Sequence, residues 1–177
     1  RQLSAVAGFE RIGILAADMV RSGDVAMIDA GSTVAQIAPF LAARTTKLPR
    51  TFLTNCYAVV HGMAELADHE DVLMCPGQFN RRENAVYGND TIEYLRRFHA
   101  NSDVNRRAVA VKRAMMERSD ETWLMVDHTK FDQRYLENVA PLEELTGIIT
   151  DRQPEPEFAS QLERAGIRLL AWREDTH

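Results

Sequence analysis

The chain has 177 residues, of which 45% are hydrophobic and 27% charged, and this composition suits one folded domain with its own core. A net charge of −5 argues against a DNA- or RNA-binding surface, which needs a basic stripe to neutralise phosphates. No apolar stretch approaches the roughly 18 residues that cross a bilayer, and no signal peptide leads the chain. We therefore expect a cytoplasmic protein with no membrane partner.

Helical and strand patterns alternate through the first half of the chain. Apolar residues at helical spacing, from Ile12 to Val20, end at the Ser-Gly-Asp stop at 22–24. The following segments predict a strand over 25–29, a helix around 34–41, a strand over 50–55, a helix around 59–66 and a strand over 71–75.

The second half continues the alternation after a polar stretch over 76–88 that is either a hairpin or an extended loop. The patterns predict helices around 91–98 and 104–117, strands over 122–126 and 147–150, a helix over 156–165 and a strand over 167–172. Repeated βα units predict an α/β fold in which a mainly parallel sheet is flanked by helices on both faces. Neither an internal repeat nor a linker to a second domain interrupts it.

The cysteines and histidines give no sign of a metal site. Cys56 and Cys75 each lie in or beside an apolar, strand-like run, which favours reduced core thiols over a disulfide or metal ligands. The five histidines show no metal-ligand spacing; His61 and His69, for example, are eight residues apart across a helix end. We expect no metal and no cofactor.

The most informative segment covers residues 25–33. An apolar run ends at Asp29, turns at Gly31 and opens with Ser32 and Thr33 into a helical pattern. Glycine allows a tight turn and close approach of a ligand, while a helix start offers unpaired N–H groups and hydroxyl donors. The segment therefore predicts a phosphate-binding turn. The alternative is that Ser32 or Thr33 only caps the helix.

Polar residues follow four of the predicted strands, together with the turn at 76–77. They are Asp29, Asn55, Asp127 and Asp151. In an open α/β sheet the ligand crevice lies at the carboxyl ends of the strands, so four such residues on one rim predict a small-molecule site. Lys130, three residues after Asp127, either brings its ammonium to a ligand oxygen or is a solvated loop lysine.

An ordered set of short motifs resembles the sugar-phosphate-sensing domain of DeoR-type bacterial transcriptional regulators, and the resemblance covers almost the whole chain. The motifs are Asp-Ala-Gly-Ser-Thr at 29–33, Thr-Asn at 54–55, Gly77, Ala-Val-Lys-Arg-Ala-Met at 110–115, Asp-His-Thr-Lys-Phe at 127–131 and Ile-Thr-Asp at 149–151. The resemblance implies a fold like that of sugar-phosphate isomerases and CoA transferases.

The resemblance also implies roles for individual residues toward a phosphorylated sugar or polyol. It implies that residues 31–33 hold the phosphate, that Asn55 and Gly77 line the sugar side and that Lys130 binds a ligand oxygen. Lys112 matches a position near the pocket, although its helical setting allows a surface role equally well.

For the whole protein, the resemblance implies that residues 1–177 are the effector-binding domain of a homo-oligomer. A winged helix-turn-helix domain would precede Arg1 in the intact regulator, and DNA would be a partner only through that domain.

The chain departs from the family pattern in two places. Gln78 stands where the family has a second glycine, so that wall of the site differs in shape. The segment at 100–103 joins two predicted helices where the family has an apolar strand and a glycine-rich turn. Since losing a strand from a parallel sheet is costly, we expect that the natural protein has further residues here.

Two functions fit these observations. The first is a non-catalytic sensor in which effector binding shifts the DNA-binding equilibrium of the intact protein. The alternative is a sugar-phosphate isomerase-like enzyme on the same fold, with Asp127 or Asp151 as the base. No constellation of His, Glu and Asp supports the enzyme, so we favour the sensor.

Overall fold

The computed structural model describes residues 2–44, 49–66, 70–98, 106–131 and 141–173. Its elements in chain order are α1 (Gln2–Met19), β1 (Val25–Ile28), the 3₁₀ helix η1 (Val34–Gln36), α2 (Ile37–Ala42), β2 (Thr51–Thr54), α3 (Tyr57–Gly62), β3 (Asp71–Met74), β4 (Gln78–Asn80), β5 (Ala85–Tyr87), α4 (Asn89–Leu95), α5 (Arg106–Glu117), β6 (Trp123–Met125), the 3₁₀ helices η2 (His128–Lys130) and η3 (Leu142–Glu144), β7 (Gly147–Thr150), α7 (Pro156–Arg164) and β8 (Arg168–Ala171).

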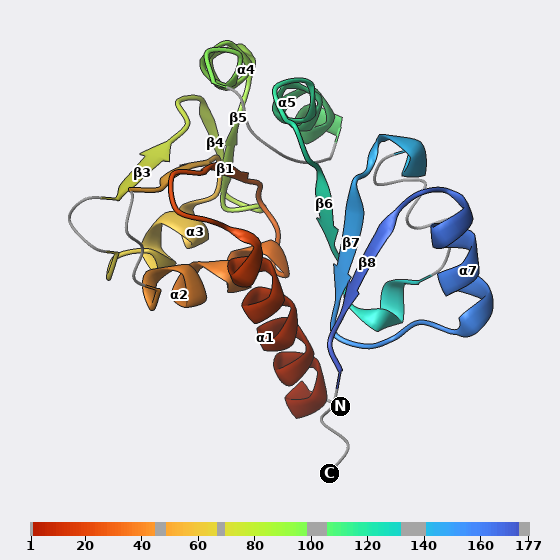
Figure 1. Ribbon diagram of the computed structural model, residues 1–177. Coiled ribbons are helices and arrows are strands. Elements are labelled where there is room, and N and C mark those ends of the chain that lie inside the picture. Colours follow the sequence, from red (N-terminus) through yellow and green to blue (C-terminus); the bar gives the residue numbers. More distant parts are fainter. Residues whose placement is uncertain (1, 45–48, 67–69, 99–105, 132–140, 174–177) are drawn as a thin grey trace.

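Six of the strands form two parallel sheets, with orders β1-β2-β3 and β6-β7-β8 (Figure 1). β4 and β5 form an antiparallel hairpin, so the polar stretch over 76–88 is a hairpin and not an extended loop. The predicted parallel α/β class is confirmed. In the described residues, however, the strands belong to two three-stranded sheets, whereas the sequence predicted one continuous sheet.

Alternation along β1 and β2 places neighbouring residues in different layers. Ile28 and Phe52 lie in the buried cluster that contains residues of α1, α2 and α3. Met27 and Leu53 lie in a second cluster with residues of β5, α4 and α5. Since successive side chains of a strand point to opposite faces, helices cover this sheet on both sides.

Helix α1 packs against both parallel sheets and lies between them in Figure 1. Ile149 of β7 is buried in the same cluster as Ile12 of α1 and Ile28 of β1. The other face of the C-terminal sheet packs on α7, where Leu124 and Leu162 share a third cluster. One helix therefore joins the two sheets into one body, which matters for the site described below.

The element boundaries differ from the predicted ones where a local residue weakens the pattern. The helix expected around 34–41 is divided into η1 and α2, with Pro39 in the first turn of α2, where a missing N–H is tolerated. The helix expected to extend to Leu66 ends at Gly62, a poor helix former. Among the described helices, none has the length and apolar character needed to cross a bilayer.

A buried ion pair lies at the amino ends of β2 and β3 and connects them. Arg50 and Glu70 directly precede these strands, and their side chains are 0% and 1% exposed. Arg50 Nε donates to Glu70 Oε1, and Nη2 donates to Oε2 at 2.9 Å and to the Leu41 carbonyl at 3.0 Å. The guanidinium thus ties both strands to the end of α2.

Candidate functional site

The turn after β1 has the predicted relation to a helix start. Thr33 is buried and precedes η1 in a helical conformation, and its side chain makes no capping hydrogen bond. The carbonyls of Gly31 and Thr33 accept from the amides of Ala35 and Gln36 at 2.9 and 3.3 Å. The amides of Ser32 and Thr33 have no acceptor among the described residues. Two adjacent N–H groups and two hydroxyls are therefore available to an anion.

Gly31 does not have the conformational role that the sequence suggested. Its φ angle is outside the left-handed region, and a Cβ atom here would meet only Val34 Cγ2 at 3.7 Å. An alanine would therefore fit the turn itself. What glycine provides is free space in front of the backbone, as close approach of a ligand requires.

The carboxyl ends of β1 and β2 bring Asp29 and Asn55 side by side. The register pairs Ile28 with Thr54 and Thr54 with Met74, so the next residues along the three strands, Asp29, Asn55 and Cys75, are neighbours. This is the juxtaposition that parallel strands were expected to produce.

Lys112 extends from α5 to this edge. Its Nζ lies 3.4 Å from Asp29 Oδ2, and both residues are buried, with Lys112 8% exposed. Its neighbours in α5, Val111 and Met115, are fully buried. The surface role that the sequence left open is therefore excluded, and Lys112 supplies a positive charge beside the polar strand ends.

Asn55 is the most unusual residue of the site. It is 0% exposed, and neither Oδ1 nor Nδ2 has a hydrogen-bond partner among the described residues. Its backbone carbonyl accepts from the Val86 amide at 2.8 Å, so the main chain is fixed while the side-chain amide is left unsatisfied. Buried amides without partners are rare and cost about 1–3 kcal/mol. A bound polar molecule would satisfy this amide.

Gly77 shapes the turn after β3. Its φ angle is 149°, and a Cβ atom would overlap Thr91 Oγ1 and lie 2.8 Å from the Tyr87 carbonyl oxygen. Thr91 Oγ1 donates to the Pro76 carbonyl at 2.6 Å, which locks the turn. The glycine is therefore needed for packing, whatever it does toward a ligand. Gln78, the departure from the family pattern, is an exposed residue of β4.

Two side chains near Asp29, those of Cys75 and Tyr87, are neutral. Burial, followed by the nearby Asp29 carboxylate, raises the pKa of Cys75 to about 12. The pKa of Tyr87 is also raised, mainly by burial, then by its hydrogen bond to Glu83 and by the charge of Asp29. Cys56 and Cys75 are both free and buried, and their core positions match the prediction.

A second polar group lies at the carboxyl ends of β6 and β7. Asp127 Oδ1 accepts from the Thr129 amide at 3.0 Å, which caps η2, and Lys130 Nζ lies 3.8 Å from Asp127 Oδ2. Lys130 is 40% exposed at its side chain. Phe131 packs on Phe158 with ring centroids 5.4 Å apart, so the loop is anchored behind the lysine.

The sequence reasoning missed His128. Asp151 Oδ1 accepts from the His128 amide and Oδ2 contacts His128 Nδ1, both at 2.7 Å. Asp151 is buried, so this bidentate contact fixes the imidazole and the start of η2. The available signal was that His128 follows one strand-end acid and that a second such acid, Asp151, ends the neighbouring strand.

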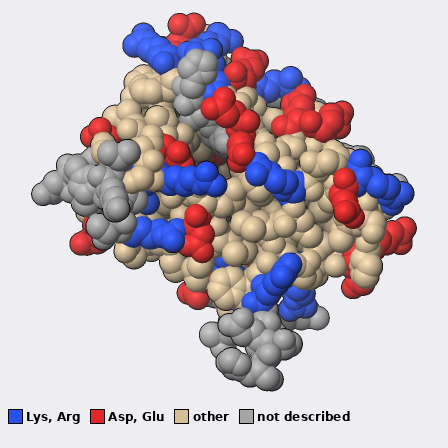
Figure 2. Space-filling view, in the orientation of Figure 1, with Lys and Arg blue, Asp and Glu red and all other residues tan. Residues whose placement is uncertain are grey.

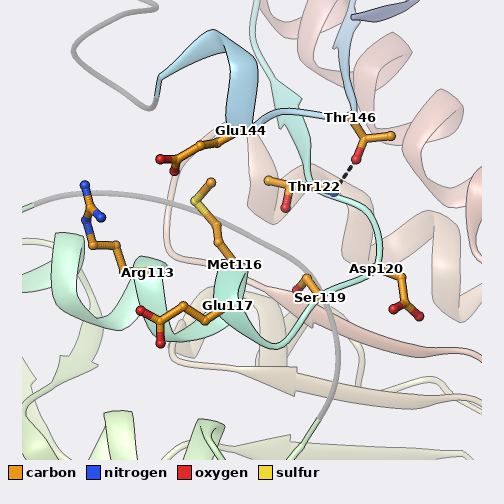
Figure 3. Close-up of a pocket in the computed structure, with 8 residues that line it drawn as sticks. All are labelled: Arg113, Met116, Glu117, Ser119, Asp120, Thr122, Glu144 and Thr146. Atoms are coloured by element: carbon orange, nitrogen blue, oxygen red, sulfur yellow. Dashed lines mark hydrogen bonds between the residues drawn. The ribbon is translucent and has the colours of Figure 1, made fainter. Parts of the chain in front are cut away.

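The cavity drawn in Figure 3, about 370 Å³, lies elsewhere. Thr122 and Thr146, which precede β6 and β7, are joined by a 2.9 Å hydrogen bond from the Thr122 amide to Thr146 Oγ1. They place the cavity at the amino ends of these strands, away from Asp127 and Asp151. Its charged lining is Arg113 with three acids, Glu117, Asp120 and Glu144. Such a lining does not suit an anion, and no predicted site residue lies in it.

Comparison with known families gives one match over most of the chain. The family model described as the DeoR C terminal sensor domain matches residues 6–104 and 100–152. The two matching stretches meet at 100–104, where the sequence lacks the strand and turn expected from the resemblance. That segment lies outside the described residues.

The chain is also similar to several transcriptional regulators of known or assigned role. It is 26% identical to the HTH-type transcriptional repressor GlcR of Bacillus subtilis, over 93% of this chain and 67% of the relative. It is 22% identical to the glycerol-3-phosphate regulon repressor of Escherichia coli, over 82% and 62%. It is 25% identical to the L-fucose operon activator of Haemophilus influenzae, over 77% and 59%.

Proposed function

This chain belongs to the family of DeoR C-terminal sensor domains, a regulatory and not a catalytic domain, and we propose that it binds a phosphorylated sugar or polyol at the carboxyl ends of β1 and β2. The observation that carries the proposal is the fully buried amide of Asn55, which has no hydrogen-bond partner among the described residues and lies next to Asp29, the residue that leads into a turn with two available N–H groups. One ligand with a phosphate and neighbouring hydroxyls would satisfy both.

The proposed contacts follow the chemistry of each group. The amides and hydroxyls of Ser32 and Thr33 bind the phosphate, and Asn55 exchanges hydrogen bonds with sugar hydroxyls. Asp29 accepts from a hydroxyl, while Lys112 balances the charge of Asp29 and of the ligand.

The two remaining positions shape and complete the site. Gly77 allows the turn after β3 to pack closely on Thr91 and Tyr87. The second polar group, Asp127 with Lys130, contacts the far end of the ligand.

In the intact regulator we propose that binding acts through linkage. The effector binds one arrangement of a homo-oligomer more tightly and thereby shifts the DNA-binding equilibrium. DNA contact belongs to a winged helix-turn-helix domain outside residues 1–177, and the protein acts in the cytoplasm. The relatives named for glycerol 3-phosphate and L-fucose regulation support a carbohydrate-derived effector.

A ligand panel tests the proposal. Triose, pentose and hexose phosphates, glycerol 3-phosphate and the matching unphosphorylated compounds are titrated by calorimetry, and each phosphate is also assayed for turnover. We expect binding of at least one phosphate without turnover and much weaker binding of its unphosphorylated form. Equal affinity for both forms contradicts the phosphate assignment, whereas isomerisation supports the enzyme alternative.

Removing both hydroxyls of the turn, with Ser32→Ala and Thr33→Ala together, is expected to weaken binding of the identified phosphate at least about tenfold. Hydrogen bonds to a charged group contribute roughly 1.5–3 kcal/mol each, although the backbone amides remain. Ser119→Ala is the control. The Ser119 hydroxyl donates to the Met115 carbonyl at the end of α5, so it is not part of the turn at 31–33. Unchanged affinity in the double variant by calorimetry argues against the phosphate turn.

Lys130→Met is expected to weaken phosphate binding more than about tenfold by loss of a charge-assisted contact. Stability should stay within about 0.5 kcal/mol, because the exposed side chain keeps its apolar stem. Melting temperature and ligand-induced stabilisation are measured together. An intact ligand response would show that Lys130 is a solvated loop lysine.

The chain alone is expected not to bind operator DNA specifically. On the face shown in Figure 2, basic side chains alternate with acidic ones and form no continuous basic stripe, and the net charge is −5. Electrophoretic mobility shifts at physiological salt check this. Submicromolar operator binding by residues 1–177 would refute it.

A further inference from the structure

Two glycines of α1 bring its backbone directly onto neighbouring loops. A Cβ atom on Gly8 would lie 2.8 Å from Asp151 Oδ2, and one on Gly13 would lie 2.5 Å from the Gln36 carbonyl oxygen. Glycine inside a helix costs about 1 kcal/mol relative to alanine. Since both positions are buried, close contact explains the absence of a side chain at each.

The Gly8 contact leads to the second polar group of the site. Asp151, against which Gly8 packs, holds the ring and the amide of His128 at 2.7 Å. His128 begins η2, which ends at Lys130. Any displacement of η2 that moves the Asp151 carboxylate therefore acts directly on the α1 backbone, with no α1 side chain between them.

The Gly13 contact leads to the phosphate turn. Gln36, whose carbonyl meets Gly13, ends η1 and donates from Nε2 to the Ser32 carbonyl at 3.3 Å. The amide of Gln36 donates to the Thr33 carbonyl. Gln36, which faces Gly13, is therefore hydrogen-bonded to both Ser32 and Thr33.

From these contacts we infer that α1 reports occupancy of the effector site, because its backbone packs at Gly8 against the second polar group and at Gly13 against the residue that ends η1. A helix side chain would absorb small movements by changing rotamer, but the glycine backbone cannot, and the Asp151 carboxylate that it meets is itself held by two contacts to His128. When a ligand bridges the turn and η2, it fixes their relative position, and α1 shifts with them. This inference rests on the proposed function and specifies its regulation.

The chain carries a natural reporter of this shift. Arg11, between the two glycines, lies over the Trp172 ring, with its Cζ 5.8 Å from the ring centroid. The Trp172 amide donates to the Thr150 carbonyl at 3.0 Å, which fixes the residue at the end of β8. Movement of α1 changes the surroundings of this indole. A Trp123→Phe background leaves Trp172 as the single tryptophan.

The experiment measures binding and the α1 response separately. Inorganic phosphate, glycerol 3-phosphate and hexose phosphates are titrated into the Trp123→Phe protein, with affinity from calorimetry and Trp172 emission recorded in parallel. We expect the emission to change with the same midpoint as binding. Gly8→Ala should abolish that response while a calorimetric signal persists, and Glu10→Ala, at an exposed position of α1, should keep it.

Hydrogen exchange of the α1 amides in the unaltered chain repeats the test without substitutions that affect folding. A phosphate that binds with neither an emission change nor altered exchange in α1 overturns the inference and leaves the proposed function standing. If no compound of the panel binds, the proposed function fails, and the inference fails with it.

Discussion

Arg50→Met is expected to lower the free energy of unfolding by about 3–5 kcal/mol, because it takes the guanidinium away from the buried Glu70 carboxylate. Glu70 is 1% exposed and accepts two hydrogen bonds from Arg50. The substitution also removes the donors to the Leu41 and Arg44 carbonyls. Urea unfolding followed by circular dichroism measures the change.

Arg44→Met is the matched control. Arg44 forms an ion pair with Asp18 at 2.6 Å, but these side chains are 40% and 56% exposed. Exposed pairs contribute about 0–1 kcal/mol, so this change should be nearly silent. The double variant Arg50→Met with Glu70→Leu should be more stable than Arg50→Met alone, since the uncompensated charge is gone. A small loss in Arg50→Met would show that the Glu70 carboxylate is compensated without Arg50.

The order of helices and strands could be predicted because the periods of apolar residues are local. The prediction of one rim with four polar residues was right only for each pair: parallel strands place Asp29 and Asn55 at one edge, whereas Asp127 and Asp151 follow strands of the other sheet.

What the sequence could not reveal depends on partners far apart in the chain. Arg50 and Glu70 are 20 residues apart, and each resembles an ordinary charged residue at a strand start. His128 and Asp151 are 23 positions apart, so their contact likewise has no local signal in the sequence. Gly8 and Gly13 resemble weak helix positions until the groups facing them are known.

The division into two parallel sheets was equally inaccessible. The pattern of strands predicts how many there are and that they run parallel, but not which pairs are neighbours. In the described residues β1 and β6 end their respective sheets, and α1 and its core cluster connect them. The polar groups at the two sheets therefore depend on α1 for their relative position, which is why its contacts matter for sensing.

Asn55→Leu is expected to change stability and binding in opposite directions. Leucine keeps the branched shape but removes two buried polar atoms that have no partner among the described residues, so the free energy of unfolding should rise by about 1–2 kcal/mol. The same change removes the hydrogen bonds to the ligand and faces its hydroxyls with methyl groups. Binding of the phosphate identified in the panel should weaken about a hundredfold, as for two lost hydrogen bonds.

Asn80→Leu serves as the matched control for this prediction. Asn80 Oδ1 already accepts from the amides of Arg82 and Glu83 at 3.0 and 3.3 Å, so its loss should destabilise the hairpin and leave ligand affinity unchanged. Urea unfolding and calorimetry on both variants give the four values needed. A destabilised Asn55→Leu protein that binds its ligand normally would show that the Asn55 amide is satisfied within the fold. Increased stability with lost binding is the result expected of a polar group that is kept for its ligand at a cost to the unliganded protein.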